Sequence, residues 1–132
     1  MNRAILICFT LIAVLSGCTK DQSNNSACQT CSVISFRTDI IPIFQANCSL
    51  SGCHTGAPAS AAGHVSLDSA VAYAQATYPG KGYVTAYNAN NSIMYSQLLP
   101  NFPNHMPNNG KQLDDCTIKK IYCWINQGAL NN

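Results

Sequence analysis

The segment "ANCSLSGCHTGAP", residues 46–58, contains two cysteines and a histidine directly after the second. Four residues separate Cys48 from Cys53, and His54 follows. Two thiols can form thioether bonds to a haem while an adjacent imidazole binds the iron, although the usual attachment signature, C-x-x-C-H, has only two intervening residues. Gly52 lies in the longer spacer, where its conformational freedom can relax the turn. The segment predicts one covalently bound haem c.

Three other interpretations apply to the same residues. A disulfide between Cys48 and Cys53 is chemically easy in an oxidising compartment, and His54 would then be an incidental surface residue. A structural zinc site needs four ligands, and the remaining histidines, His64 and His105, are not paired at the spacing that zinc sites use. A Cys–His nucleophile needs a free thiolate with its base brought near by the fold, which adjacency in sequence does not provide.

A second iron ligand is suggested by "NHMPNNG", residues 104–110, just ahead of the last predicted helix. Pro107 restricts Met106 to an extended backbone, as a ligand presented from a loop requires. A thioether favours Fe(II) and raises the reduction potential. We therefore expect His54 and Met106 to be the metal ligands. The rival sixth ligands are His105, His64 and Met94.

Two helical patterns bracket the folded part. In "RTDIIPIFQANC", residues 37–48, Asp39 can cap a helix that has Pro42 in its first turn. In "LDDCTIKKIYCWINQGALNN", residues 113–132, Asp114 is the expected cap and Gly128 the expected stop. The buried stripe of this helix is Ile118, Ile121, Tyr122 and Ile125. Residues 64–78 and 91–107 hold one or two further short helices, and no alternating strand pattern occurs, so the fold class is all-α.

The N-terminus predicts export. A basic start, "MNR", precedes the apolar run "AILICFTLIAVL", which has signal-peptide length and is too short to span a bilayer comfortably. The tetrapeptide "LSGC" ending at Cys18 resembles the lipobox of bacterial lipoproteins. We expect a signal peptide at 1–17, a lipidated polar tether at 18–33 and one folded domain at 34–132. The location is then the periplasmic side of a Gram-negative membrane, with the outer membrane favoured, or the cell surface.

Four cysteines remain after the lipid and the haem are assigned. Cys116 and Cys123 are seven residues apart on one helix face, a rise of about 10 Å, which is too far for them to bond to each other. An extended segment from Cys28 to Cys31 also spans about 10 Å. It could therefore form a strap with two cross-bridges to the helix, in either pairing direction. The alternative is a local Cys28–Cys31 bridge that leaves the other two thiols free.

The order of these motifs resembles class I cytochrome c, in particular short bacterial domains that read D-I-x-P-I-F, C…C-H, S-x-x-Y, M-P, L, I and W-I-x-x-G-A. Here they are Asp39–Phe44, Cys48–His54, Ser92 with Tyr95, Met106–Pro107, Leu113, Ile121 and Trp124–Ala129. The resemblance covers about residues 36–130. It implies an all-α cytochrome c fold in which the first and last helices cross and the haem occupies a hydrophobic crevice.

The resulting hypothesis is electron transfer by a membrane-anchored monohaem c-type cytochrome with redox partner proteins. Two protein ligands on the iron leave no open coordination site, so we expect no enzymatic activity. The alternatives are a haem enzyme or gas sensor with a displaceable sixth ligand, and a haem-free, disulfide-braced binding lipoprotein. The chain has 7 Lys and Arg against 5 Asp and Glu, with no basic patch, so nucleic acid is not an expected partner.

Overall fold

The computed structural model describes residues 28, 30–58, 60–108 and 111–132. Every regular element within these ranges is helical, in agreement with the predicted all-α class. The signal peptide expected at 1–17, the expected lipidation site at Cys18 and most of the expected tether lie outside the described residues. In chain order the elements are η1 (Phe36–Ile40), α2 (Ile41–Asn47), η2 (Ala62–His64), α3 (Ala72–Ala76), η3 (Ala89–Asn91), α4 (Ile93–Gln97) and α5 (Asp115–Asn126).

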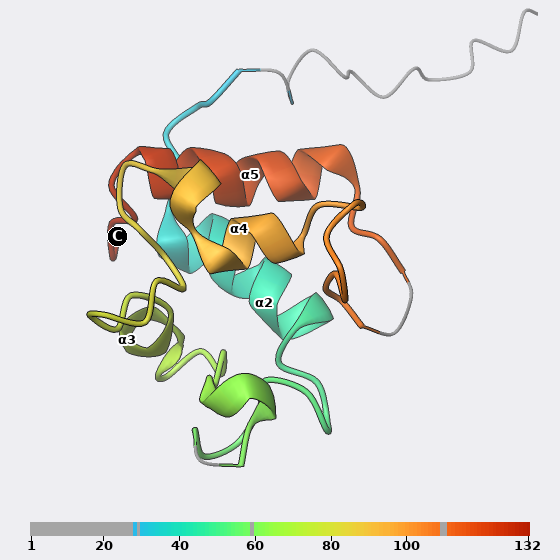
Figure 1. The fold of residues 1–132 in the computed structure, drawn as a ribbon. Coiled ribbons are helices and arrows are strands. Elements are labelled where there is room, and N and C mark those ends of the chain that lie inside the picture. Colours follow the sequence, from blue (N-terminus) through green and yellow to red (C-terminus); the bar gives the residue numbers. More distant parts are fainter. Residues whose placement is uncertain (1–27, 29, 59, 109–110) are drawn as a thin grey trace, which may run out of the picture.

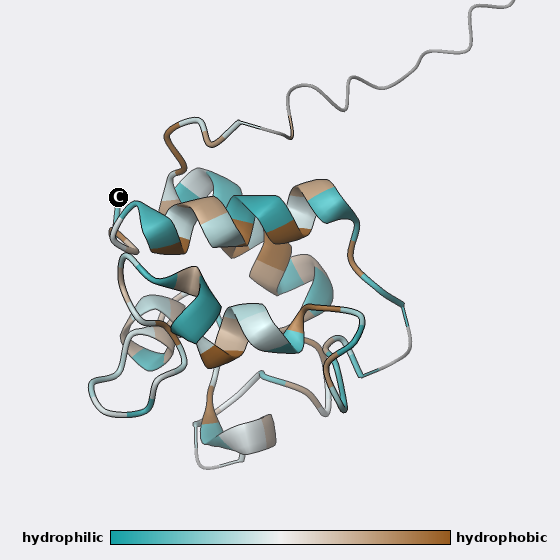
Figure 2. Ribbon diagram, turned by 45° about the horizontal axis from the view of Figure 1, so that its top comes forward, coloured by the Kyte–Doolittle hydropathy of each residue, from teal (hydrophilic) through white to brown (hydrophobic). Residues whose placement is uncertain are grey.

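The longest helix, α5, forms one side of the core. Asp114 caps it by accepting a hydrogen bond from the Thr117 backbone N–H at 2.9 Å, as predicted. Its buried side chains are Ile118, Ile121, Cys123, Trp124 and Ile125. Figure 2 shows apolar parts of α5 on the side that faces the other helices. The predicted stripe is confirmed at its three isoleucines, whereas Tyr122 is only half-buried.

The first helical run begins earlier than the sequence predicted. Ser35 rather than Asp39 is the cap, and its hydroxyl accepts a hydrogen bond from the Thr38 backbone N–H. Asp39 lies inside η1, where its carboxylate reaches back to accept from the Ser35 backbone N–H at 2.9 Å. This reciprocal pair satisfies donors that a helix start leaves free, so the chain is already helical before Pro42.

An aromatic cluster joins the two ends of the fold. The Phe36 ring lies 5.1 Å from that of Trp124, 5.3 Å from that of Tyr73 and 6.1 Å from that of Phe44, measured between centroids. Trp124 is fully buried, and its indole N–H donates to the Leu130 carbonyl at 2.9 Å. The cluster therefore packs η1 and α2 against α5 and α3.

The C-terminal residue is also tied to η1. The side-chain oxygen of Asn132 accepts a hydrogen bond from the Phe36 backbone N–H at 2.8 Å. The backbone carbonyl of Asn132 accepts one from the Arg37 backbone N–H at 2.9 Å. Figure 1 shows the C-terminus lying beside the segment that enters η1. The segments 34–37 and 132 thus close the fold next to the end of α5.

The predicted strap is confirmed, and its direction is now given. Cys28 is bonded to Cys116 and Cys31 to Cys123, with Cα–Cα separations of 5.1 and 5.4 Å. The strap therefore runs parallel to α5, and Gln127 continues the contact by donating to the Ser32 carbonyl at 2.6 Å. The alternative local Cys28–Cys31 bridge is excluded.

Candidate functional site

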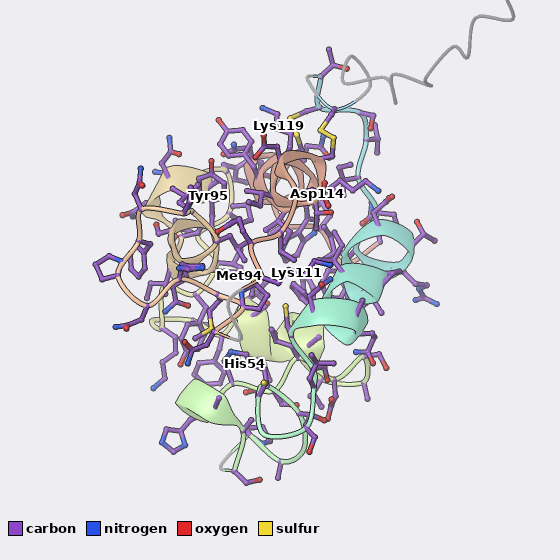
Figure 3. The ribbon with its side chains drawn as sticks, turned by 90° about the vertical axis from the view of Figure 1, so that its right-hand side faces the viewer. His54, Met94, Tyr95, Lys111, Asp114 and Lys119 are labelled. Atoms are coloured by element: carbon purple, nitrogen blue, oxygen red, sulfur yellow. A yellow bond between two sulfur atoms is a disulfide. The ribbon has the colours of Figure 1, made fainter. Side chains whose placement is uncertain are left out.

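A crevice opens between α2, α4, α5 and the segment from His54 to Leu67. Its cavity volume is about 170 Å³, smaller than the roughly 300–1,000 Å³ of sites for drug-sized ligands and large enough only for a small molecule or one ring of a larger one. Its apolar lining consists of Phe44, Ala62, Gly63, Val65, Leu67, Ile93, Leu98 and Ile121. The remaining lining residues are Cys48, His54, Tyr83, Met94, Gln97 and Met106. Figure 3 shows His54 and Met94 on the segments that border this space.

The loop after α2 carries Cys48 and His54 to the crevice. Cys48 follows the last turn of α2, where its N–H donates to the Phe44 carbonyl at 2.8 Å. The chain then reverses. The Cys53 N–H donates to the Leu50 carbonyl at 2.8 Å, and the His54 N–H donates to the Cys48 carbonyl at 3.0 Å. Residues 53 and 54 consequently return to the start of the loop.

Asp68 fixes this loop from outside the predicted motif. Its carboxylate accepts hydrogen bonds from the Ser49 hydroxyl, from the Thr55 hydroxyl at 2.8 Å and from the Gly56 N–H at 2.8 Å. These hydrogen bonds stabilise the ionised carboxylate and lower the pKa of Asp68, and the bond from Ser49 makes the largest contribution. Sequence reasoning missed Asp68. Its only signal was a lone acidic residue 14 positions after His54.

The His54 ring is held in one orientation and one tautomer. Nδ1 lies 3.2 Å from the Val65 carbonyl oxygen, and a carbonyl can only accept, so Nδ1 carries the proton. In the neutral imidazole Nε2 is then an unprotonated acceptor. The Leu67 N–H donates to the His54 carbonyl at 2.8 Å and anchors the backbone as well.

The two thiols of the motif differ in exposure. Cys48 lines the crevice and is half-buried, whereas Cys53 is exposed and is not part of the crevice lining. Burial, with a smaller contribution from repulsion by Cys53, raises the pKa of the Cys48 thiol to about 11. Cys48 is therefore a neutral thiol at pH 7, which makes it a poor nucleophile.

Methionine sulfur borders the opposite part of the crevice. Met106 is held by its N–H, which donates to the Gln97 carbonyl at 2.6 Å at the end of α4. Met94, which the sequence suggested was core filler on a helix, lines the same crevice. The rival ligands His64 and His105 are not among the lining residues. The structure thus brings Cys48, His54 and Met106 together with Met94.

The prediction of one covalently bound haem c, with iron held by His54 and Met106, is corrected. Four of the six described cysteines are joined in disulfides. No group of three or more His, Cys, Asp or Glu side chains in the described residues could hold a metal ion. Covalent attachment also needs both thiols of the motif, and only Cys48 lines the crevice. These observations point away from a covalently bound haem.

No protein-family model matches the chain, and no curated protein or solved structure matches it either. The two disulfides indicate an extracellular or otherwise oxidising environment. None of the helices in the described ranges is long and apolar enough to cross a membrane.

Proposed function

We propose that this protein is an exported, disulfide-braced carrier that binds one apolar small molecule in the crevice and exchanges electrons with partner proteins through that molecule. The observation that carries the binding proposal is the crevice itself. Apolar side chains from α2, α4 and α5 line it, and only a few polar groups accompany them. Sites of this kind bind ligands through their apolar walls and orient them through the few polar groups.

The polar groups restrict the chemistry of the ligand. In the neutral imidazole of His54, Nε2 is an acceptor because Nδ1 donates to the Val65 carbonyl. It would pair with a hydroxyl or N–H of the ligand, and the amide of Gln97 lies in the same lining. A quinol, which has an aromatic body, a donating hydroxyl and redox activity, fits this arrangement.

A carrier role is favoured over catalysis by the state of the lining groups. The Cys48 thiol is protonated at neutral pH, since burial raises its pKa to about 11. The residues that line the crevice include no carboxylate, and Asp68 is engaged with the loop instead. A nucleophile or an acid–base pair is therefore not assembled around the ligand.

The proposed place of action is the outer face of a membrane. The disulfides support an oxidising compartment, and the strap begins ten positions after Cys18 in the sequence. Lipid attachment at Cys18 would hold the carrier near membrane redox partners through the intervening tether.

Binding can be tested with a short-chain ubiquinone as the probe and Trp124 as the reporter. Trp124 is the chain's single tryptophan, and it is fully buried three residues after Ile121 of the crevice lining. We expect saturable quenching of its fluorescence by one equivalent of quinone. Linear, unsaturated quenching would contradict a binding site.

A pair of variants separates the crevice from the general surface. Ile93 lines the crevice and is 42% exposed, so Ile93→Asp adds charge there with little effect on folding. We expect it to weaken quinone binding about tenfold or more, because a charge in an apolar site is strongly disfavoured. Leu99, 36% exposed and outside the lining, is the matched control, and Leu99→Asp should bind normally. Equal effects of the two variants would contradict the site.

The role in electron transfer has its own test. Extraction of the exported protein with organic solvent should release a redox-active molecule. A redox-inactive ligand, such as a fatty acid, would overturn electron transfer while leaving binding intact.

A further inference from the structure

We propose that Cys48 and Cys53 are a redox-active thiol pair that closes a third disulfide when the protein meets an oxidising partner. Neither cysteine belongs to the two disulfides of the strap. The pair lies at the other end of α2 from η1, in the loop that leads to His54. This proposal does not depend on which molecule the crevice binds.

The loop brings the two residues together. The His54 N–H donates a hydrogen bond of 3.0 Å to the Cys48 carbonyl. His54 directly follows Cys53, so this bond holds the backbone beside Cys53 close to that of Cys48. The turn from Leu50 to Cys53 is closed by a second backbone bond of 2.8 Å. A disulfide needs Cα atoms within about 7 Å, which a loop closed in this way can supply.

The electrostatics of the two thiols agrees with this loop geometry. Burial raises the pKa of the Cys48 thiol, and repulsion from Cys53 raises it further. Their unequal exposure assigns their roles. Exposed Cys53 can meet the disulfide of another molecule, whereas Cys48, half-buried in the crevice lining, is the less accessible of the two thiols.

The reaction is thiol–disulfide exchange with a protein or small-molecule disulfide as the oxidant. The Cys53 thiolate attacks one sulfur of the external disulfide, forms a mixed disulfide and releases one thiolate. The Cys48 thiol then loses its proton to solvent, and its sulfur displaces the second external thiolate. The protein loses two electrons and two protons in total, and the external disulfide becomes two thiols. Because the pKa of Cys48 is about 11, the second step should accelerate as pH rises from 7.

The compartment indicated by the strap makes this reaction relevant. Cys28–Cys116 and Cys31–Cys123 show that the folded chain holds disulfides. Closing Cys48 onto Cys53 would replace a thiol in the crevice wall by a disulfide. The pair would thus report the redox state of the compartment at the ligand site.

Sequential labelling of the full exported protein tests the proposal. Free thiols are alkylated in denaturant with iodoacetamide after an acid quench, the protein is reduced, and new thiols are labelled with N-ethylmaleimide. After equilibration with oxidised glutathione, both Cys48 and Cys53 should carry the second label. After equilibration with excess reduced glutathione they should carry the first label, while the strap cysteines still carry the second.

Variants distinguish a pair from two independent thiols. In Cys53→Ser, Cys48 should take the first label under both conditions, because Cys53, the thiol that attacks the external disulfide, is absent. In Cys48→Ser, Cys53 should remain as a mixed disulfide with glutathione. The proposal is overturned if both thiols of the wild type take the first label in oxidised glutathione, or if either is linked to a strap cysteine.

Discussion

Removal of the strap disulfides one at a time should show that the two bridges share one loop. With Cys28–Cys116 intact, the bridge from Cys31 to Cys123 closes a ring of about ten residues, three from the strap and seven from α5. Loop-closure entropy assigns about 3 kcal/mol to such a ring. The same argument applies to the other bridge, so either double alanine variant should lose about 3 kcal/mol of unfolding free energy.

Removal of both bridges should cost more than twice the loss from one. The last bridge to be removed closes a loop of nearly the whole domain, since Cys28 and Cys116 are 88 residues apart. A loop of that length corresponds to about 4.5 kcal/mol, so the quadruple variant should lose about 7 kcal/mol in all. That loss is comparable with the entire stability of a small domain.

Burial makes the two double variants unequal. Cys123 is 2% exposed and belongs to the core, whereas Cys116 is half-buried. Alanine at 123 removes a buried sulfur and leaves a small cavity, which should add about 1 kcal/mol to the loss. Cys31→Ala/Cys123→Ala should therefore be the less stable of the two double variants.

Urea unfolding without reductant, followed by circular dichroism, measures these losses. The slope against urea should also increase, because an unfolded chain with fewer cross-links exposes more surface. The reasoning would be refuted if both double variants lost less than about 1 kcal/mol, or if the quadruple variant were no less stable than the doubles.

Three further changes test local features. Gly128→Ala should cost about 1–2 kcal/mol in urea unfolding because φ is +102° there, and Tyr87→Ala should not rescue it, since the exposed Tyr87 ring can move from the new Cβ. Asp114→Ala should cost about 1 kcal/mol through loss of the α5 cap, and a thermal midpoint equal to wild type would contradict the cap. The pKa of Asp68 is lowered in the folded protein, so its stabilisation is present above about pH 4 and is lost as pH falls through the lowered pKa. Between pH 5 and pH 3, the free energy of unfolding should therefore fall less for Asp68→Asn than for wild type. Parallel curves of unfolding free energy against pH for the two proteins would contradict this role of Asp68.

Local signals in the sequence were sufficient for α5 and for the strap. The cap at Asp114 and the isoleucine stripe act within one helix, and the spacing of Cys116 and Cys123 is a property of helix geometry. The pairing direction could not be predicted, because it depends on where the chain enters η1. That entry is set by contacts from Ser32 and Phe36 to the C-terminal segment, about 95 residues away.

The crevice was predicted only in part. Cys48, His54 and Met106 lie around it, while Cys53 is exposed and is not part of its lining. That difference follows from the reversal of the loop and from its attachment to Asp68, neither of which spacing reveals. A motif of residue types therefore suggested a covalent cofactor that the arrangement of the described residues does not support.

The central claim is that the crevice holds its ligand without a covalent bond. Mass spectrometry of one sample of the full exported protein, first under native and then under denaturing, non-reducing conditions, tests it most directly. The account predicts one ligand's extra mass in the native spectrum and, after denaturation, only the mass of the processed chain with its disulfides. Extra mass that stays on the denatured peptide containing Cys48 and Cys53 would contradict the account.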